Sequence, residues 1–356
     1  MAGTTDLIEI GQSIWLDNIT RDMLDDGTIA RYIADLGVTG LTSNPSIFDK
    51  AISGSTAYDA DVAALAAEGL GAEEIFFRLA IADLRRAADL FAPIAEATRG
   101  EDGWVSLEVS PTLADDADAT VAAARRLHAE ADRPNLFIKI PGTPAGLVAI
   151  EEAIFHGVPV NVTLLFSTEQ YLAAAEAHLR GLERRRAAGL DLAVASVASL
   201  FISRWDVALN ELLPGPMRNT VGVAIGAASY AASCALHASE RVADLVAAGA
   251  PLQKLLFAST GVKDPSAPDT LYVSALAAPG TVNTMPDGTL LAVADHGDTP
   301  VGLSADATGP LEALAAADAA GADLAGLADR LQRDGAAAFV GAWEAMIGSI
   351  DAKASA

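Results

Sequence analysis

Eight short runs rich in β-branched and other apolar residues recur along the chain, and stretches with helical periodicity separate them. The runs cover residues 13–17, 40–43, 104–109, 136–140, 158–165, 193–199, 254–259 and 280–283. The helical stretches include 114–131, 168–188 and 222–248. Strands that alternate with helices pair in parallel, because each helix carries the chain back before the next strand begins. Eight such units predict an α/β protein with a closed (β/α)8 TIM barrel, whose functional site lies at the carboxyl ends of the strands.

Two stretches are longer than a minimal barrel requires. Residues 48–103, after the second predicted strand, are largely helical, and the stretch 309–356 is rich in alanine. No Pro/Ser-rich linker separates either stretch from the barrel. We therefore expect one domain, 1–356, with a helical insertion at about 48–103 and a helical C-terminal tail at about 309–356.

Charge and composition exclude several classes of partner. The formal net charge of −24 at pH 7 argues against nucleic acid and anionic membranes, because both bind clustered Lys and Arg. No uninterrupted apolar run is long enough to span a bilayer, and residues 1–6 lack the basic and apolar regions of a signal peptide. The single cysteine, Cys234, cannot form an intrachain disulfide. These features predict a cytoplasmic protein and leave open whether it is a monomer or a homodimer.

Lys139 lies between apolar β-formers in the run FIKIPG (137–142). Alternation along a strand places Lys139 and Phe137 on the same face, and if that face points into the barrel, the amine lies beneath its mouth. Burial disfavours the charged form of an amine and lowers its pKa, which makes it a nucleophile able to form a Schiff base. The alternative is a strand-end lysine whose amine reaches the solvent.

Polar residues end seven of the predicted strands, although the other positions of these strands are mostly apolar. They are Asp17, Asn44, Glu108, Lys139, Asn161 with Thr163, Ser199 and Ser259. Helix capping or a turn explains any one of them taken alone. Seven strands that end in this way favour a shared site at one end of the barrel.

Asp17 and Glu108 are single acidic residues on apolar strands. A Schiff-base lyase needs one group that manages protons while the imine forms, and a second that takes a hydroxyl proton when the C–C bond breaks. Burial raises the pKa of a carboxyl group, whereas a nearby Lys139 ammonium lowers it, so the sequence leaves the direction of the shift open.

Five motifs, in order along the chain, resemble transaldolase, a class I, Schiff-base-forming (β/α)8 enzyme of the pentose phosphate pathway. The motifs are WLDN (15–18), TSNPS (42–46), SLEVSP (106–111), FIKIP (137–141) and NVTL (161–164). The resemblance implies that Lys139 is the Schiff-base nucleophile and that Asp17 acts on the C4 hydroxyl of the donor. It implies that Glu108 acts through a water held with Thr163. It implies that Asn44 and Asn161 hydrogen-bond the dihydroxyacetone part of the bound intermediate, and Ser46 is a further candidate for substrate binding.

The same resemblance implies a phosphate site on the sixth and seventh strands. Ser199, Phe201 and Arg204 match the serine, aromatic residue and arginine of the sixth strand; a salt bridge to Asp206 is the alternative role of Arg204. The seventh strand reads ASTGVK (258–263), whereas well-known members have Ser-aromatic-Arg there. Two further candidates for the phosphate site therefore come from this strand, Ser259 and, as the second cation, Lys263.

Other motifs predict no further chemistry. The five histidines show no spacing typical of a metal site, and with one cysteine a zinc site is not expected. The Gly-rich run 222–226 lacks a complete nucleotide-binding fingerprint, so we interpret it as close helix packing. The three arginines 184–186 are interpreted as a solvated helix end.

The sequence therefore predicts a transaldolase that needs no cofactor and no metal. By resemblance, it transfers a dihydroxyacetone unit from sedoheptulose 7-phosphate to glyceraldehyde 3-phosphate and yields erythrose 4-phosphate and fructose 6-phosphate. The alternatives are a related class I aldolase that releases free dihydroxyacetone, another Schiff-base sugar-phosphate lyase, and an inactive barrel that binds sugar phosphates. Members of the releasing group tend to carry a tyrosine-based acid site, so Glu108 favours transfer.

Overall fold

Eight parallel strands close into a barrel in chain order, with β1 next to β8. The computed structural model describes residues 2–297 and 302–355. The strands are β1 (Ser13–Leu16), β2 (Val38–Leu41), β3 (Val105–Glu108), β4 (Leu136–Pro141), β5 (Val160–Leu165), β6 (Ser196–Phe201), β7 (Lys254–Ala258) and β8 (Val282–Met285). The predicted (β/α)8 barrel is confirmed, and each predicted strand overlaps an observed one.

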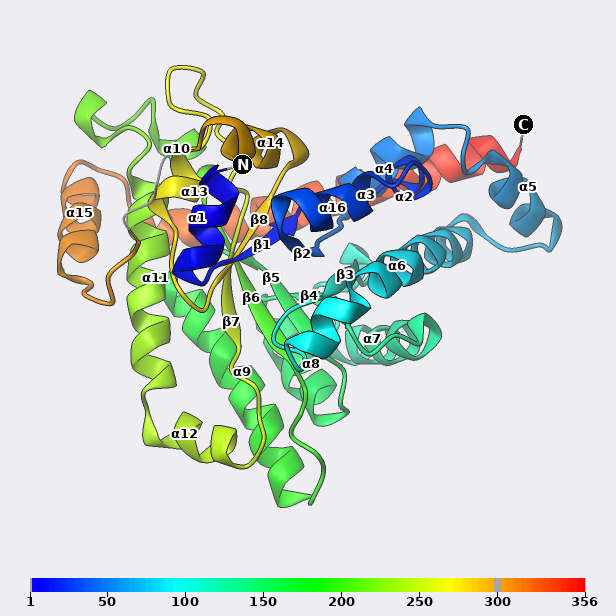
Figure 1. Cartoon of the computed structure of the whole chain (residues 1–356), viewed down its shortest axis with the longest axis horizontal. Coiled ribbons are helices and arrows are strands. Elements are labelled where there is room, and N and C mark those ends of the chain that lie inside the picture. Colours follow the sequence, from blue (N-terminus) through cyan, green and yellow to red (C-terminus); the bar gives the residue numbers. More distant parts are fainter. Residues whose placement is uncertain (1, 298–301, 356) are drawn as a thin grey trace.

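Helices precede and separate the strands and cover the outside of the barrel (Figure 1). Before β4 they are α1 (Ala2–Ile10), α2 (Arg21–Asp25), α3 (Thr28–Leu36), α4 (Pro45–Gly54), α5 (Asp59–Ala67), α6 (Ala72–Ala97), the short 3-10 helix η1 (Pro111–Leu113) and α7 (Ala117–Ala131). After β4 they are α8 (Pro144–Phe155), α9 (Thr168–Ala187), α10 (Ser203–Leu209), η2 (Gly215–Met217), α11 (Val221–His237), α12 (Glu240–Ala247), α13 (Leu271–Ala275), α14 (Asp287–His296), α15 (Thr308–Ala319) and α16 (Leu324–Ala354).

The barrel strands are apolar on both sides because helices cover the outside and side chains fill the inside. Every residue of β4, β5 and β6 is buried. The extra helices expected after the second strand and at the C-terminus are also present. Three helices, α4 to α6, stand between β2 and β3, and α15 and α16 follow the last strand.

One of the predicted helical stretches contains a break. The stretch 222–248 forms two helices, α11 and α12, that meet at an angle of 64°. The Ser239 side chain accepts a hydrogen bond from the backbone N–H of Val242 and starts α12 as an N-cap. The alanine-rich periodicity continues across this point, so it hides the break. Among the residues that the structure describes, no single helix is long and apolar enough to cross a membrane; α11 and α12 pass that test only as a bent pair, by length and composition.

The glycine-rich start of α11 packs closely, as the sequence predicted. A Cβ atom on Gly222 would lie 2.8 Å from Asp206 Oδ2 and 2.8 Å from the carbonyl oxygen of Ile202. The carboxylate of Asp206 accepts hydrogen bonds from the backbone N–H groups of Val221 and Gly222. Glycine is therefore required where α11 meets α10.

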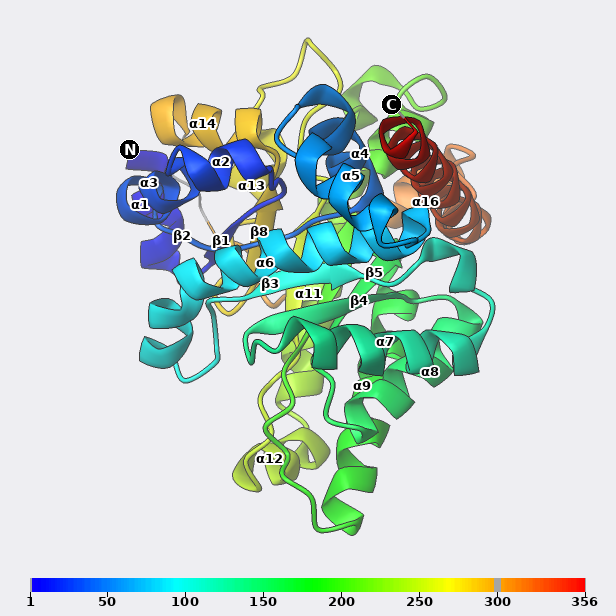
Figure 2. The ribbon, with the colours of Figure 1, turned by 90° about the vertical axis from the view of Figure 1, so that its right-hand side faces the viewer.

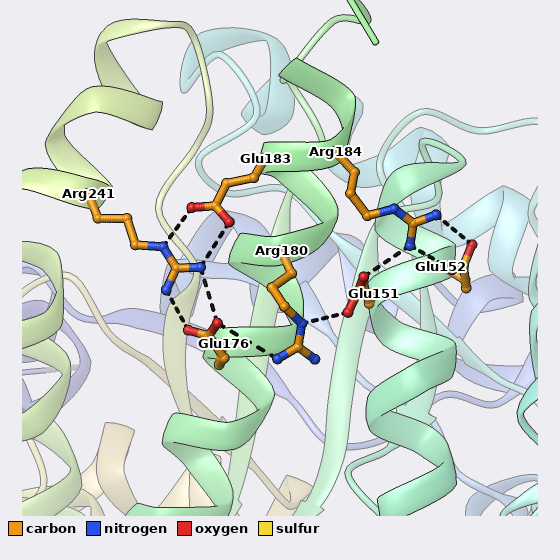
Figure 3. A network of polar contacts seen from close by, with 7 residues as sticks. All are labelled: Glu151, Glu152, Glu176, Arg180, Glu183, Arg184 and Arg241. Atoms are coloured by element: carbon orange, nitrogen blue, oxygen red, sulfur yellow. Dashed lines mark hydrogen bonds and ion pairs between the residues drawn. The ribbon is translucent and has the colours of Figure 1, made fainter. Parts of the chain in front are cut away.

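The arginines of α9 lie in its last turn, and Arg186 is exposed there as the sequence predicted; for the buried Arg185 that interpretation was wrong, and Arg184 pairs with a neighbouring helix. Figure 3 shows Arg184 paired with two carboxylates of α8, and Arg241 of α12 bridging two carboxylates of α9. Arg185 is buried and donates to the carbonyl oxygens of Asp191 and Phe155. The residues of the network are Glu151, Glu152, Glu176, Arg180, Glu183, Arg184 and Arg241. The packing of α8 and α12 against α9, which spacing within one helix does not reveal, brings these charges together.

Helix α16 lies over the end of the barrel at which the strands terminate (Figures 1 and 2). It has 31 residues and contacts α4, α5, α6, η1 and β5. At Gly335 the helix comes so close that a Cβ atom would lie 3.0 Å from Leu164 Cδ2. The tail that was expected to pack on the barrel therefore covers part of the end where the site is expected.

Candidate active site

Lys139 points into the barrel and its amine is held by two acceptors. Its Nζ donates to the backbone carbonyl oxygen of Ser43 at 3.0 Å and lies 3.3 Å from Glu108 Oε2. The residue is 5% exposed. The same face of β4 carries Phe137, whose ring stacks on Trp104 with 4.0 Å between centroids. The alternative of an amine that reaches solvent is wrong.

Asp17 follows β1 and belongs to a second hydrogen-bonded group at the same end. Thr42 Oγ1 donates to Asp17 Oδ1 at 2.7 Å and lies 2.8 Å from Thr284 Oγ1. Since Thr42 then accepts from Thr284, a short chain of hydroxyls from β8 orients the carboxylate. These two hydrogen bonds therefore fix the orientation of the Asp17 carboxylate.

Both carboxyl groups have raised pKa values. Burial raises the pKa of Glu108, and the Lys139 amine, which attracts and hydrogen-bonds the carboxylate, opposes the rise. Burial also raises the pKa of Asp17, opposed by the charge of Lys139 and by the Thr42 hydrogen bond. The direction that the sequence left open is thus upward for both groups, because desolvation outweighs the lysine. A carboxyl group with a raised pKa can exchange protons closer to neutral pH.

Asn161 joins three strands inside the barrel. Its Nδ2 donates to Ser106 Oγ at 3.1 Å, and its Oδ1 accepts from Ser199 Oγ at 2.7 Å. Ser106 lies on β3 and Asn161 on β5, so the bond passes beneath β4 through the barrel interior. Asn161 is fully buried in this layer. The Ser199 hydroxyl is therefore used to hold the Asn161 side chain.

Thr163 lies one step closer to the mouth on the same face of β5. Its side chain is fully buried, and its Oγ1 makes no hydrogen bond with any residue in the described ranges 2–297 and 302–355. Buried hydroxyl groups are almost always paired with protein or ordered water. The Oγ1 is therefore suited to hold a water at the same end of the barrel as Glu108 and Lys139.

Asn44 and Ser46 begin α4 next to the mouth. The Oδ1 of Asn44 accepts from the backbone N–H of Ile47 at 3.0 Å, so the residue is an N-cap. The capping bond uses the oxygen and leaves the Nδ2 amide as the donor that could reach a ligand. Ser46 is exposed on the first turn. Capping and binding are compatible at Asn44, because they use different atoms.

The candidates for the phosphate site lie where β6 and β7 end. Ser203 Oγ and Ser259 Oγ are 2.9 Å apart, and Ser259 has a left-handed backbone with φ of +56°. Arg204 is exposed on the first turn of α10, and the expected alternative, a salt bridge to Asp206, is not formed in the described part of the chain. Lys263 is exposed too, and its Nζ would lie 3.7 Å from a Cβ placed on Gly261. Neither cation forms a salt bridge with an acidic residue that the structure describes, so both can meet an anion.

The aromatic candidate, Phe201, is the last residue of β6, next to the candidates for the phosphate site. Its ring lies 5.3 Å from that of Phe166 and it is buried at the end of β6. Along β6 and the residues that follow it, Phe201 stands between Ser199, which contacts Asn161, and the exposed Arg204.

Three contacts at the site were not foreseen from the sequence. Thr42 orients Asp17, and the backbone oxygen of Ser43 holds Lys139, although both residues lie in a motif that the sequence had singled out. The third is Phe339 of α16, whose ring centroid lies 6.0 Å from Lys139 Nζ. No local signal marks Phe339, because it stands in an alanine-rich helix far along the chain.

No group of three or more His, Cys, Asp or Glu side chains that could hold a metal ion occurs in residues 2–297 and 302–355. What the site brings together is a buried primary amine, two carboxyl groups with raised pKa values and an unpaired hydroxyl. This set can form an imine with a carbonyl compound and transfer protons on both sides of it.

Known proteins resemble the chain over nearly its whole length. The family model described as Transaldolase/Fructose-6-phosphate aldolase matches residues 14–350. A curated protein named Transaldolase from Thermobifida fusca is 45% identical over 353 residues, which cover 96% of this chain and 95% of the relative. Another from Saccharopolyspora erythraea is 45% identical over 354 residues, covering 97% and 95% of the two chains. One from Neisseria gonorrhoeae is 44% identical over 344 residues, covering 96% and 98%.

Proposed function

The chain belongs to the transaldolase/fructose-6-phosphate aldolase family, and from that premise we propose that it is a transaldolase that works through a Schiff base on Lys139. The donor is a ketose phosphate such as sedoheptulose 7-phosphate, and the acceptor is glyceraldehyde 3-phosphate. The products are erythrose 4-phosphate and fructose 6-phosphate.

In the first step, the Lys139 amine attacks the donor carbonyl. The resulting carbinolamine loses water and becomes an iminium ion, for which one group must give and take protons. Glu108 takes this role because its Oε2 lies 3.3 Å from Nζ. A water on Thr163 Oγ1 relays the protons between Glu108 and the substrate oxygen.

In the second step, the C3–C4 bond breaks. Asp17 takes the proton of the C4 hydroxyl, the electrons of the C3–C4 bond form the C2=C3 double bond of the enamine, the π electrons of the iminium group move to nitrogen, and the aldose leaves. The three-carbon enamine stays on Lys139 until the acceptor aldehyde arrives and the steps reverse. The hydrogen bond from Thr42 keeps Asp17 directed while it accepts the proton.

Substrate binding is divided between the two sides of the mouth. We assign Asn44, through its Nδ2, and Asn161 to the three-carbon unit, with Ser46 as a further substrate-binding residue at the start of α4. Arg204 and Lys263 offer cations to the phosphate, with the hydroxyl of Ser259 and the ring of Phe201 between them. Lys263 is a point charge where an arginine would present a planar fork, so we propose that Arg204 makes the bidentate contact.

The observation that carries the proposal is the buried pairing of Lys139 with Glu108 beside the oriented Asp17. A barrel that only binds sugar phosphates has no need of a desolvated amine between two carboxyl groups. The releasing aldolases are the nearer alternative, and the glutamate at position 108 favours transfer over release.

The proposal is tested by trapping. The protein is incubated with fructose 6-phosphate, reduced with borohydride, digested and mapped by mass spectrometry. We expect a three- or six-carbon adduct on Lys139 and none on the other lysines, which are Lys50, Lys254, Lys263 and Lys353. An unmodified Lys139 during turnover would contradict the mechanism. Dihydroxyacetone that accumulates without an acceptor, as fast as transfer occurs with one, would assign a releasing aldolase.

Compartment and assembly belong to the same proposal. We place the enzyme in the cytoplasm, in keeping with a lone, half-buried Cys234 that carries no disulfide. We propose a monomer or a homodimer, which sedimentation equilibrium distinguishes by mass.

A further inference from the structure

Phe339 is an aromatic side chain over the candidate nucleophile that no step of the reaction described above uses. Its ring centroid lies 6.0 Å from Lys139 Nζ, and it is half-buried against the core from the side of α16. Every other group near Nζ in that reaction comes from a barrel strand or from the loop that follows one. Phe339 is therefore the residue through which the C-terminal helix α16 contacts the reacting amine.

The helix that carries Phe339 is fixed on both sides of the ring. Before it, Gln332 Nε2 donates to the carbonyl oxygens of Gly142 and Leu164, both at 3.0 Å, where β4 and β5 end. After it, the Trp343 ring packs edge-on against Phe76 of α6 with 5.1 Å between centroids. The position of the ring over Lys139 is thus set by contacts that do not involve Phe339 itself.

We propose that Phe339 caps the Schiff-base nitrogen on Lys139 and keeps water from the three-carbon enamine, so that transfer to an aldehyde prevails over release of dihydroxyacetone. This inference rests on the proposed function of the site. Phe339 acts as a specificity-determining residue: it decides between two fates of one intermediate.

The physical reason is twofold. The iminium ion is a cation, and an aromatic face at about 6 Å attracts a cation most strongly where water is excluded. The ring also occupies the side of Nζ that α16 covers, which leaves the acceptor's path along the strand ends as the open approach. An apolar cover of this kind protects a reactive intermediate from hydrolysis.

Release is the reaction that the cap suppresses, and it consumes one water. The enamine carbon takes a proton from water and becomes an iminium ion, and the hydroxide adds to the iminium carbon. The C–N bond of the carbinolamine then breaks, which frees dihydroxyacetone and returns Lys139 as an amine. No oxidant or reductant takes part.

The test compares Phe339→Ala and Phe339→Leu with wild type. Two rates are measured with fructose 6-phosphate: dihydroxyacetone release without acceptor, and transfer to erythrose 4-phosphate. We expect the ratio of release to transfer to rise about tenfold in the alanine variant, which corresponds to about 1.4 kcal/mol in the competing barriers. The leucine variant should lie between, since leucine restores apolar cover but offers no aromatic face.

Controls separate this inference from the proposed function and from loss of packing. Ile347→Ala removes a half-buried apolar side chain two turns further along α16, and its release ratio should equal that of wild type. Borohydride trapping of wild type on Lys139 tests the proposed function by itself. If borohydride traps wild type on Lys139 but both Phe339 variants keep the wild-type ratio of release to transfer, the proposed role of Phe339 as a cap is wrong. If the alanine variant does not fold, the leucine variant decides by the same ratio.

Discussion

At the residue scale, the site gives two carboxyl groups different partners. Glu108 contacts the Lys139 amine directly, whereas Asp17 is held through the Thr42 hydroxyl. The direct contact suits the group that moves protons at the imine nitrogen. Within residues 2–297 and 302–355, the carboxylate held by a hydroxyl has no hydrogen bond on its other oxygen, which suits the group that takes a proton from the substrate.

Asp17→Asn tests the raised pKa of Asp17. A carboxyl group whose pKa is raised in the folded state stabilises the protein fully below its unfolded value, 3.8, and that contribution is lost as the pH rises through the folded value. Asparagine resembles the protonated form. The free energy of unfolding of the variant, relative to wild type, should therefore increase as the pH rises above about 4 in urea titrations. Transfer activity should fall at least about 100-fold.

The control for this prediction is Asp35→Asn, at an exposed position of α3. This variant should keep the transfer activity of wild type. A difference in unfolding free energy for Asp17→Asn that does not change with pH would contradict the upward pKa shift.

Thr163→Val separates function from stability. The Thr163 hydroxyl is buried without a protein partner in the described residues, so its replacement leaves no other protein group unsatisfied. Valine has the same shape without the hydroxyl, and stability should therefore change by less than about 1 kcal/mol. Imine formation in pre-steady-state measurements should slow about tenfold or more, because the relay water loses its support. Thr163→Ser, which keeps the hydroxyl, should retain the rate; equal rates for valine and threonine would remove Thr163 from the mechanism.

At the scale of elements, α16 connects parts of the chain that the barrel alone leaves apart. In its first half, α16 contacts the ends of β4 and β5 through Gln332. Near its last residues it contacts the insertion, where Lys353 Nζ pairs with Asp59 and donates to the carbonyl oxygen of Ser55. Ser349 Oγ donates to Asp49 of α4 between these points. The C-terminal helix and the helices after β2 thus form one cover over the mouth.

Gln332→Ala removes the anchor of α16 on the strand ends. The amide bridges two backbone carbonyls, and one of them belongs to Leu164, whose φ of +58° is left-handed. We expect a loss of about 1–3 kcal/mol in unfolding free energy and faster amide hydrogen exchange along α16, measured by mass spectrometry. The neighbouring exposed Arg333→Ala should change neither quantity. Wild-type exchange in the glutamine variant would contradict this role.

The surface network of Figure 3 stabilises the packing of α8, α9 and α12. Arg241 contacts both Glu176 and Glu183, and these hydrogen bonds raise its pKa. Because the side chain is 39% exposed, Arg241→Ala should cost only about 0.5–1 kcal/mol at low salt. The loss should vanish in about 1 M NaCl, where exposed charges are screened. Arg218→Ala, which removes a more exposed pair with Glu211, should cost less, and a salt-independent loss for Arg241→Ala would contradict the electrostatic explanation.

At the scale of the whole molecule, one continuous apolar core joins the barrel, the insertion and the tail. It includes Ile138 of the barrel, Phe76 of α6 and Trp343 of α16. Elements that share a core unfold together, because none of them keeps its buried surface alone. We therefore propose that residues 1–356 form one domain.

Scanning calorimetry tests this proposal. We expect a single transition whose calorimetric enthalpy equals its van't Hoff enthalpy. Near-ultraviolet circular dichroism, which reports on the packed tryptophans, should follow the same curve. Two resolved transitions, or a tail that proteolysis removes without lowering the main transition temperature, would show that α15 and α16 fold apart from the barrel.

The order of strands and the set of polar residues at their ends could be predicted from the sequence. Parallel strands place their carboxyl ends at one edge, so Asp17, Glu108 and Lys139 had to come together once the barrel closed. Helix ends were less predictable, as the break at Ser239 shows, because a cap adds one hydrogen bond without changing the apolar period. The direction of the Asp17 pKa could not be predicted either, since it depends on how completely the carboxyl group is buried.

By itself the sequence determined the barrel, its family and the amine with two carboxyl groups, because alternation and short motifs are local properties of the chain. The tertiary structure alone decided what surrounds that amine. The contact of Lys139 with Phe339 joins β4 to α16, and the bond to the Ser43 carbonyl joins β4 to the end of β2. No periodicity encodes such contacts, since they arise only when closure of the barrel and packing of α16 fix distances between distant segments. The cover that we propose to decide between transfer and release is therefore a property of the folded chain.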